Sequence, residues 1–318
     1  KYKDLSIKDL LINIGAYKKD RNGDGAYKLT SGGLLFFGKY NSITDRFPHF
    51  QLDYFEKDSN LNSRWIDRVS TGDASFPDLN MFDFLLIVMD KLSSTVKEPF
   101  ILDENSKTRI PFKKDLEESL REALVNSLMH AYYDADFPIK ITALPDYYEF
   151  KNPGNMRVTI DEFIKGNSSV TRNPTISTLL RKIGFSEKAG SGGQKIFDVA
   201  ARHNLILPTI QSPFDSTTII IWKVDFKHNI NKLPEPDKSI LEYISEKGSI
   251  KRKQIENDLG LAGQEYSYRR ALDRLIEQEF IKRVGSGPGT KYILKKTSQE
   301  HYYLMKQTMR EIEDALKI

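Results

Sequence analysis

The sequence predicts an α+β protein in which an α/β sandwich is followed by a winged helix-turn-helix domain, and three stretches carry this prediction. Residues 121–134, REALVNSLMHAYYD, have the spacing of a long amphipathic helix. Residues 217–224, TTIIIWKV, form an apolar, β-rich run that would close a sheet. Residues 237–294 have the pattern of three helices followed by two strands around the turn GSGPG, which is typical of a winged helix-turn-helix.

The composition excludes several classes of protein. With 318 residues, 39% of them hydrophobic, the chain is long enough for two or three domains with ordinary buried cores. No run of 18 apolar residues and no signal peptide are visible, so no membrane partner is expected. The absence of cysteine excludes disulfides, thiolate metal sites and a cysteine nucleophile, and it favours a cytoplasmic location.

The first 112 residues are expected to form an α/β segment that leads into the sandwich. Thr30 or Ser31 is placed to cap a short buried helix in LTSGGLLFFGK, because a hydroxyl at this position can accept a free backbone amide. Apolar periodicity predicts the other elements of this segment, which are a helix at 5–17, a strand at 49–55, a helix at 82–92 and a hairpin from 98–102 and 108–112.

The central helix carries the first candidate site. Glu122, Asn126 and His130 follow one another at intervals of four and therefore share one face. They are either the solvated face of an amphipathic helix or the polar wall of a site. The second interpretation is favoured because Asn and His are mediocre helix formers. The opposite side is a ridge of leucines that must be packed, namely Leu116, Leu120, Leu124 and Leu128.

Two motifs downstream match that helix. A hairpin from 139–144 and 147–150 ends in the turn Lys-Asn-Pro-Gly-Asn at 151–155, and Gly-Ser-Gly-Gly at 190–193 opens a helix at 194–203. Glycines before a helix let backbone amides converge on an anion, although both motifs can also be an ordinary turn and loop. Arg172 is a candidate phosphate contact because guanidinium is a bidentate donor. Between the motifs we expect helices at 159–165 and 175–183 and a polar loop at 166–172.

Together these motifs resemble the GHKL fold, the nucleotide-binding fold shared by gyrase, heat-shock chaperone, histidine kinase and mismatch-repair ATPases. That fold has Glu-x-x-x-Asn on a helix, a later Asp-x-Gly-x-Gly turn and a second glycine cluster that opens a helix. REALVNSLMHAYYD, FKNPGNM, TRNPTISTLLRKIGF and AGSGGQKIFDVA are similar to a bacterial family often labelled as an ATP-dependent DNA helicase carboxy-terminal region and usually described as transcriptional regulators. The resemblance covers about residues 29–222. In that family an Alba/Schlafen-like domain usually precedes this region, so the sequence is expected to be a fragment.

The resemblance implies roles for residues at the matching positions. Asn126 would ligate Mg²⁺ once a nucleotide is bound, and Glu122 would orient or deprotonate the attacking water. Asn152 and Gly154 would frame the adenine of ATP. The remaining nucleotide-binding positions are His130, Arg172, Gly190, Gly192 and Gly193.

Several departures from the GHKL pattern predict weak or absent hydrolysis of ATP. Asn152 stands where the fold has an acid, so it can accept the adenine amino hydrogen but supplies no charge. Asn155 replaces the second glycine. His130 stands where the catalytic ATPases have a small residue, and Met129 where they often have an acid.

The carboxy-terminal part carries the basic surplus. Residues 237–296 contain 13 Lys or Arg against 9 Asp or Glu, whereas residues 1–236 contain 32 against 31. Arginines on an exposed third helix can contact guanine edges or phosphates, which predicts binding of double-stranded DNA. A protein-interaction module remains the alternative, because acidic residues interrupt the basic face. The candidate DNA contacts are Lys251, Arg252, Tyr266, Tyr268, Arg269, Arg270, Arg274 and Lys291.

The expected domain order follows from these assignments. An amino-terminal segment at 1–112 precedes the GHKL-like domain at 113–230, a Pro-containing linker at 231–236 and the winged helix-turn-helix at 237–296. A helix at 297–318 would then pair with a second subunit or pack on its own chain.

Three hypotheses of function follow. The first is a DNA-binding transcriptional regulator with a catalytically silent nucleotide-binding or dimerisation domain. The second is an active Mg²⁺-dependent ATPase. The third is an assembly fragment of a nucleic-acid-processing protein whose amino-terminal domain lies outside this sequence.

Overall fold

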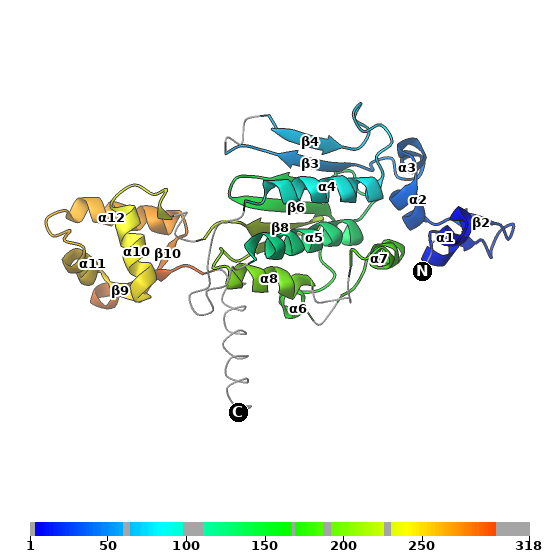
Figure 1. The fold of residues 1–318 in the computed structure, drawn as a ribbon. Helices are drawn as coiled ribbons and strands as arrows, with labels where there is room; N and C mark the ends of the chain where they lie inside the picture. Colours follow the sequence, from blue (N-terminus) through cyan, green and yellow to red (C-terminus); the bar gives the residue numbers. More distant parts are fainter. Residues whose placement is uncertain are drawn as a thin grey trace. The chain divides into compact units, whose positions relative to one another are not determined.

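The computed structural model describes residues 4–59, 64–97, 111–166, 169–186, 192–225 and 230–296 (Figure 1). The chain divides into two compact units, Lys1–Lys223 and Val224–Ile318. The boundary therefore falls before the predicted linker. Ile230 and Leu233 already pack into the core of the second unit. The predicted hairpin at 98–112 falls largely, and the predicted helix at 297–318 entirely, outside the described residues.

The first unit is built on a six-stranded sheet with strand order β4-β3-β5-β6-β8-β7. Strands β3 and β5 run parallel, and every other neighbouring pair is antiparallel. Side chains alternate along the central strands, so that Tyr148 and Phe150 are buried while Glu149 is partly exposed. The strands are β3 (Leu52–Glu56), β4 (Asp67–Ser70), β5 (Ile139–Ala143), β6 (Tyr147–Pro153), β7 (Thr209–Gln211) and β8 (Ser216–Trp222).

Helices α4 (Met81–Thr95) and α5 (Phe112–His130) lie on one face of the sheet, and α8 (Gly192–Arg202) packs beside α5 (Figure 1). Two shorter helices, α6 (Ile160–Lys165) and α7 (Pro174–Lys182), complete this layer. The first unit is thus an α/β sandwich. A capping box fixes the start of α6. The Thr159 hydroxyl accepts the Glu162 backbone amide, and the Glu162 carboxylate accepts the Thr159 backbone amide.

An ion-pair cluster holds the carboxyl end of α8 against α5. Asp115 is buried and accepts hydrogen bonds from Arg202 at 2.7 Å and from the ring of His203 at 2.9 Å. Burial alone would raise the pKa of Asp115, but these two partners outweigh it and lower the pKa. Because α8 is a rigid helix, anchoring its carboxyl end to α5 also sets the position of its first residues.

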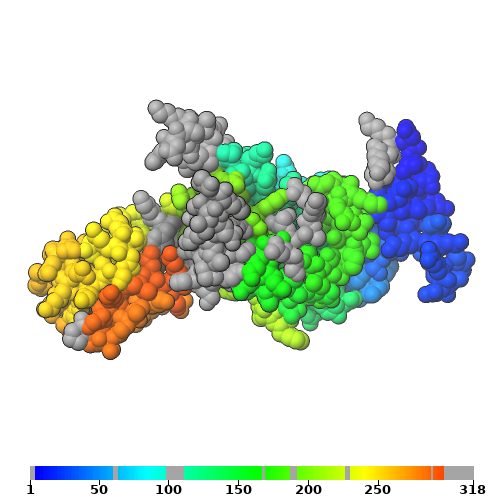
Figure 2. Space-filling model, turned by 90° about the horizontal axis from the view of Figure 1, so that it is seen from below, coloured from blue at the N-terminus to red at the C-terminus, as the bar shows by residue number. Residues whose placement is uncertain are grey.

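The amino-terminal segment forms a separate layer of short elements that protrudes from the sheet (Figures 1 and 2). Thr30 caps α2 as predicted, since its hydroxyl accepts the Gly33 amide at 3.0 Å. The segment comprises α1 (Ile7–Ile14), β1 (Tyr17–Lys19), β2 (Tyr27–Leu29), α2 (Ser31–Phe37) and α3 (Tyr40–Arg46).

The described part of the second unit contains three α-helices and a three-stranded antiparallel sheet with order β10-β11-β9. Its core includes Ile240, Ile244, Tyr268, Leu272 and Leu275. The sequence predicted two strands in this unit, but a third is present, because Ser249–Lys251 pairs with Lys291–Ile293 before the chain turns helical at Arg252. The elements are α10 (Asp237–Lys247), β9 (Ser249–Lys251), α11 (Arg252–Asp258), α12 (Glu265–Glu277), β10 (Ile281–Val284), the short 3₁₀ helix η1 (Gly287–Gly289) and β11 (Lys291–Leu294).

Candidate functional site

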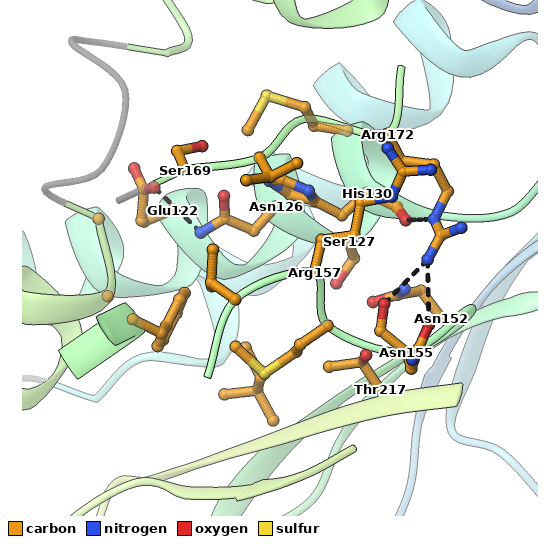
Figure 3. A pocket seen from close by; sticks show the side chains of 18 of the residues that line it. Glu122, Asn126, Ser127, His130, Asn152, Asn155, Arg157, Ser169, Arg172 and Thr217 are labelled. Carbon is orange, nitrogen blue, oxygen red and sulfur yellow. Dashed lines mark hydrogen bonds between the residues drawn. The ribbon is translucent and has the colours of Figure 1, made fainter. Parts of the chain in front are cut away.

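The polar stripe of α5 faces a pocket in the first unit (Figure 3). The helix is buried on most of its circumference, including the leucine ridge, whereas Glu122, Asn126 and His130 are only partly buried. Lys114 and Glu118, earlier on the same face, are exposed, so this face is solvated at its start and borders the pocket from Glu122 onward.

The carboxylate of Glu122 lies against the first turn of α8. A Cβ added to Gly192 would overlap the Glu122 carboxyl group, so only glycine fits here while Glu122 keeps this position. The Asn126 amide donates to Glu122 Oε1 at 3.0 Å (Figure 3). Because its nitrogen is used in this way, the carboxamide oxygen of Asn126 is turned away from Glu122.

Gly193 has a packing role. A Cβ at this position would overlap the Phe163 carbonyl oxygen and come within 2.7 Å of Cδ1 of its ring. The glycine therefore lets α8 approach the backbone of α6. Both described glycines of the predicted phosphate cradle are thus explained by close packing, and Gly190 lies outside the described residues.

The turn after β6 forms another wall of the pocket. Asn152 is buried, and its amide donates to the Pro153 carbonyl at 3.1 Å. Gly154 has φ +91°, a conformation that favours glycine. Its carbonyl accepts the Thr217 hydroxyl of β8 at 2.8 Å. The turn is therefore held to the sheet by a side chain that the sequence analysis did not single out.

Arg172 and Asn173 close the carboxyl end of α5. Arg172 donates to the His130 carbonyl and to the Asn155 carbonyl, each at 2.9 Å. The Asn173 amide donates to the Met129 and Ala131 carbonyls at 3.0 and 2.8 Å. These carbonyls end a helix and lack partners within it. These bonds use Nε and one terminal nitrogen of Arg172, which leaves others of its five N–H donors for a ligand, so its role as a phosphate contact stays a prediction.

His130 is held neutral. Burial, followed by the nearby charges of Arg172 and Arg157, lowers its pKa to about 4. The imidazole therefore carries no charge near neutral pH and can donate from one nitrogen and accept at the other. It lines the pocket between two arginines.

We expect His130 to make the first unit less stable in acid. The unfolded pKa, about 6.5, lies above the folded value of about 4, so the unfolded chain takes up the proton first as the pH falls. The stability contributed by neutral His130 is present above about pH 6.5 and is lost toward pH 4, by up to about 3 kcal/mol. Urea unfolding at about pH 7.5 and about pH 5, followed by the fluorescence of Trp65 and Trp222, measures this loss.

Both tryptophans of the chain lie in the first unit, so this signal reports on that unit alone. His130→Gln should remove most of the difference between the two pH values. His49→Gln, at an exposed histidine, is the matched control and should keep it. An unchanged pH dependence in His130→Gln would contradict the assignment.

The pocket gathers most of the predicted site from distant parts of the sequence. Helix α5, the β6 turn, α8 and the segment from Ser169 to Arg172 all contribute to its wall. Its enclosed volume is only about 80 Å³, against roughly 300–1,000 Å³ for a typical small-molecule site. A ligand of nucleotide size therefore requires side chains of the wall to move. The predicted residues that line it are Glu122, Asn126, His130, Asn152, Arg172, Gly192 and Gly193.

In the second unit the predicted DNA contacts fall into two groups. One group is exposed. Tyr266 is 74% exposed, with the Arg270 guanidinium 5.4 Å from its ring centre, and Arg269 forms an exposed ion pair with Glu265. Lys251 and Lys291 are also exposed and lie opposite each other on neighbouring strands.

The side chains of the other group form hydrogen bonds to partners within the unit. Tyr268 is fully buried and donates its hydroxyl to Glu256, so the predicted DNA contact is wrong. Arg274 binds the buried carboxylate of Asp237 with two nitrogens, one of them at 2.9 Å. Arg252 donates to the Tyr268 hydroxyl. The sequence does not show which acidic side chain binds these residues. For Arg274 it is Asp237, which lies on a different helix.

Several residues of these surfaces were missed from the sequence. Arg157 lines the pocket, but it follows the β6 turn without a motif that would mark it. Lys253, Lys282 and Arg283 are exposed in the second unit beside the predicted lysines. The alternation of β10, in which Ile281 is buried and Lys282 exposed, was the available signal for Lys282.

Within the described ranges, no group of three or more His, Asp or Glu side chains is arranged to bind a metal ion. No described helix has the length and apolar character needed to cross a bilayer.

Comparison with known proteins places the fold. Residues 136–221 match a family described as "Putative ATP-dependent DNA helicase recG C-terminal", and residues 1–53 match "Domain of unknown function (DUF8451)". No curated protein matches the chain. The chain is similar to the crystal structure of the DIP2311 protein from Corynebacterium diphtheriae, at 18% identity and a TM-score of 0.53, over 96% of this chain and 60% of that one.

The first unit therefore contains an ATPase-like segment, residues 136–221. The family match begins after α5, so Asn152, Gly154, Arg172, Gly192 and Gly193 lie inside the matched segment. Glu122, Asn126 and His130 precede it. The chain spans 60% of the length of the DIP2311 protein chain, and that likeness concerns the fold alone.

Proposed function

We propose that this chain is a DNA-binding regulator whose first unit binds an adenine nucleotide and whose second unit binds duplex DNA as a winged helix-turn-helix. The observation that carries the nucleotide half is the pocket itself. It combines the Glu122 and Asn126 stripe of α5, the Asn152 turn and the first residues of α8, all within an ATPase-like fold.

The contacts suggest how a nucleotide would lie. Adenine would lie beside Asn152 and Gly154, and its phosphates would extend toward Asn126 and the start of α8. The Asn126 oxygen, which is turned away from Glu122, suits a magnesium ion that also binds the phosphates. The ion would neutralise phosphate charge. The segment from Ser169 to Arg172 forms part of the pocket wall.

Hydrolysis is expected to be weak or absent. Glu122, the one candidate base on the α5 stripe, is held against α8 and accepts the Asn126 amide. A base in that position must leave both contacts before it can reach a water molecule. Asn152 adds no charge to the adenine end.

Asn126→Ala should weaken Mg²⁺-dependent ATP binding at least about tenfold in calorimetry of the full chain, because it removes the metal ligand. Asn41→Ala, at an exposed asparagine of α3, is the matched control and should bind normally. Glu122→Ala should leave binding intact and remove any release of phosphate. Absence of Mg²⁺-dependent ATP binding by the unaltered chain would overturn this half of the proposal.

Exposed cations support the DNA half. Lys251 and Lys291 are directly opposite each other in the sheet, and like charges in such a pair destabilise it. A polyanion laid across the pair would relieve the repulsion. Arg270 and Tyr266 together present a cation and a ring on α12. The three helices and the β10–β11 hairpin have the order of a winged helix-turn-helix.

Replacing Arg269 and Arg270 together by Ala should weaken retention of duplex DNA at least about tenfold at low salt and reduce its salt dependence. Gel-shift titrations at several salt concentrations measure both effects. Lys247→Ala, at an exposed lysine near the end of α10, is the control. No salt-dependent retention by the unaltered chain would favour the protein-interaction alternative.

A further inference from the structure

A second, wider cavity lies next to the narrow pocket in the first unit. Its volume is about 400 Å³, within the roughly 300–1,000 Å³ of small-molecule sites. It is bounded by the starts of α2 and α7, the end of α3 and the turn after α5. At Gly32, α2 and α7 pack closely, since a Cβ there would come within 2.7 Å of the Thr175 Cβ.

The wall of this cavity is positively charged. It contains Arg46, Arg157 and Arg172, and its one acidic lining residue in the described part of the chain is Asp134. Asp134 pairs with Arg46 at 3.1 Å. The formal charge of these four side chains is therefore three minus one, or plus two.

Arg157 is a cation for which the described residues supply no counter-charge. It is exposed, and among the described residues it forms no ion pair. Arg172 lies near Arg157. Burial, and after it the positive charge of Arg157, lowers the pKa of Arg172. Two neighbouring guanidinium groups that repel each other across a cavity are stabilised by an anion between them.

The rest of the wall is partly apolar and partly hydroxylic. Leu35, Phe47 and Tyr133 are buried side chains with faces on the cavity. Ser31 and Thr175 add hydroxyl groups for which the described chain supplies no hydrogen-bond partner. Such a wall suits a ligand with a charged end and a compact, partly apolar body.

We propose that this cavity binds a small phosphorylated metabolite. Its phosphate would lie among Arg46, Arg157 and the remaining donors of Arg172, and its body would lie toward Phe47 and Tyr133. A phosphate monoester matches the site better than a monocarboxylate, since its charge of about −1.5 to −2 at neutral pH nearly balances the plus two of the wall. The two cavities share Arg157 and Arg172, but the proposal does not depend on nucleotide binding.

Arg46 is the variant that separates the two sites, because it lines the wide cavity and does not line the narrow pocket. Calorimetry of the full chain would use ribose 5-phosphate, inorganic phosphate and ribose as probes. We expect ribose 5-phosphate to bind more tightly than inorganic phosphate and ribose not to bind. Arg46→Gln and Arg157→Gln should each weaken ribose 5-phosphate binding at least about tenfold.

The controls distinguish loss of the site from loss of the fold and from failure of the nucleotide proposal. Arg181→Gln, at an exposed arginine of α7 outside the cavity, should bind ribose 5-phosphate normally. Asn126→Ala should also bind ribose 5-phosphate normally. Arg46→Gln should bind ATP as tightly as the unaltered chain does. Unchanged tryptophan fluorescence in urea would show that each variant is folded. Failure of both phosphate probes to bind, or binding to Arg46→Gln as tight as to the unaltered chain, would overturn the proposal.

Discussion

Gly193→Ala is expected to destabilise the first unit by about 2 kcal/mol or more, because overpacking a close contact typically costs about 1–3 kcal/mol. The added methyl group would overlap the Phe163 carbonyl oxygen and approach its ring, so α6 and α8 must separate. The better helix propensity of Ala, about 1 kcal/mol, offsets only part of this cost. Urea unfolding followed by the fluorescence of Trp65 and Trp222 measures the effect in this unit alone.

Two other glycines serve as comparators for Gly193→Ala. Gly192→Ala meets the end of the Glu122 side chain, which can move, so Glu122→Ala should rescue it. Gly289→Ala, with no heavy atom near the added Cβ, should leave the fluorescence transition unchanged. A normal midpoint for Gly193→Ala would mean that α6 and α8 are not packed as described, and would return Gly193 to the phosphate-binding interpretation.

Arg274→Ala is expected to destabilise the second unit by about 2–3 kcal/mol, through loss of the partner of a buried charge. Removing one member of a buried ion pair typically costs about 3–5 kcal/mol. The value expected here is lower because the Arg274 side chain is 41% exposed, although Asp237 is 2% exposed. Hydrogen exchange of α10 and α12 in mild urea measures the loss, since both helices contribute to the pair.

Arg269→Ala is the matched control on the same helix. Its ion pair with Glu265 is exposed at both ends, so its loss should cost no more than about 0.5 kcal/mol. Replacing Asp237 by Asn together with Arg274 by Met should recover much of the stability, because no unpaired charge remains. Equal exchange in Arg274→Ala and Arg269→Ala would show that Arg274 is not part of the core and is available to DNA.

The sequence alone predicted several features that the structure contains, for local reasons. The four-residue spacing of Glu122, Asn126 and His130 defined one face of α5, and the leucine ridge defined the packed face. Thr30 and Thr159 marked helix starts because a hydroxyl at that position satisfies a free amide. These features depend on residues within a turn or two of each other, so periodicity and capping rules apply to them directly.

Tertiary structure decided what each charged or small residue is used for. Arg172, Arg274 and Tyr268 appeared available in the sequence, yet their partners are the ends of other helices or side chains remote in the chain. Gly192 and Gly193 marked a helix start, but their close neighbours belong to α5 and α6.

What the sequence by itself determined about this protein is therefore the polar face of its central helix and the starts of several of its helices. Only the tertiary structure decided that this face borders a small pocket and that three arginines gather at a larger one beside it. The physical reason is that the local backbone decides on which face of a helix or strand a side chain lies. The partner of that side chain, and whether its charge is neutralised, depend on segments that only folding brings together.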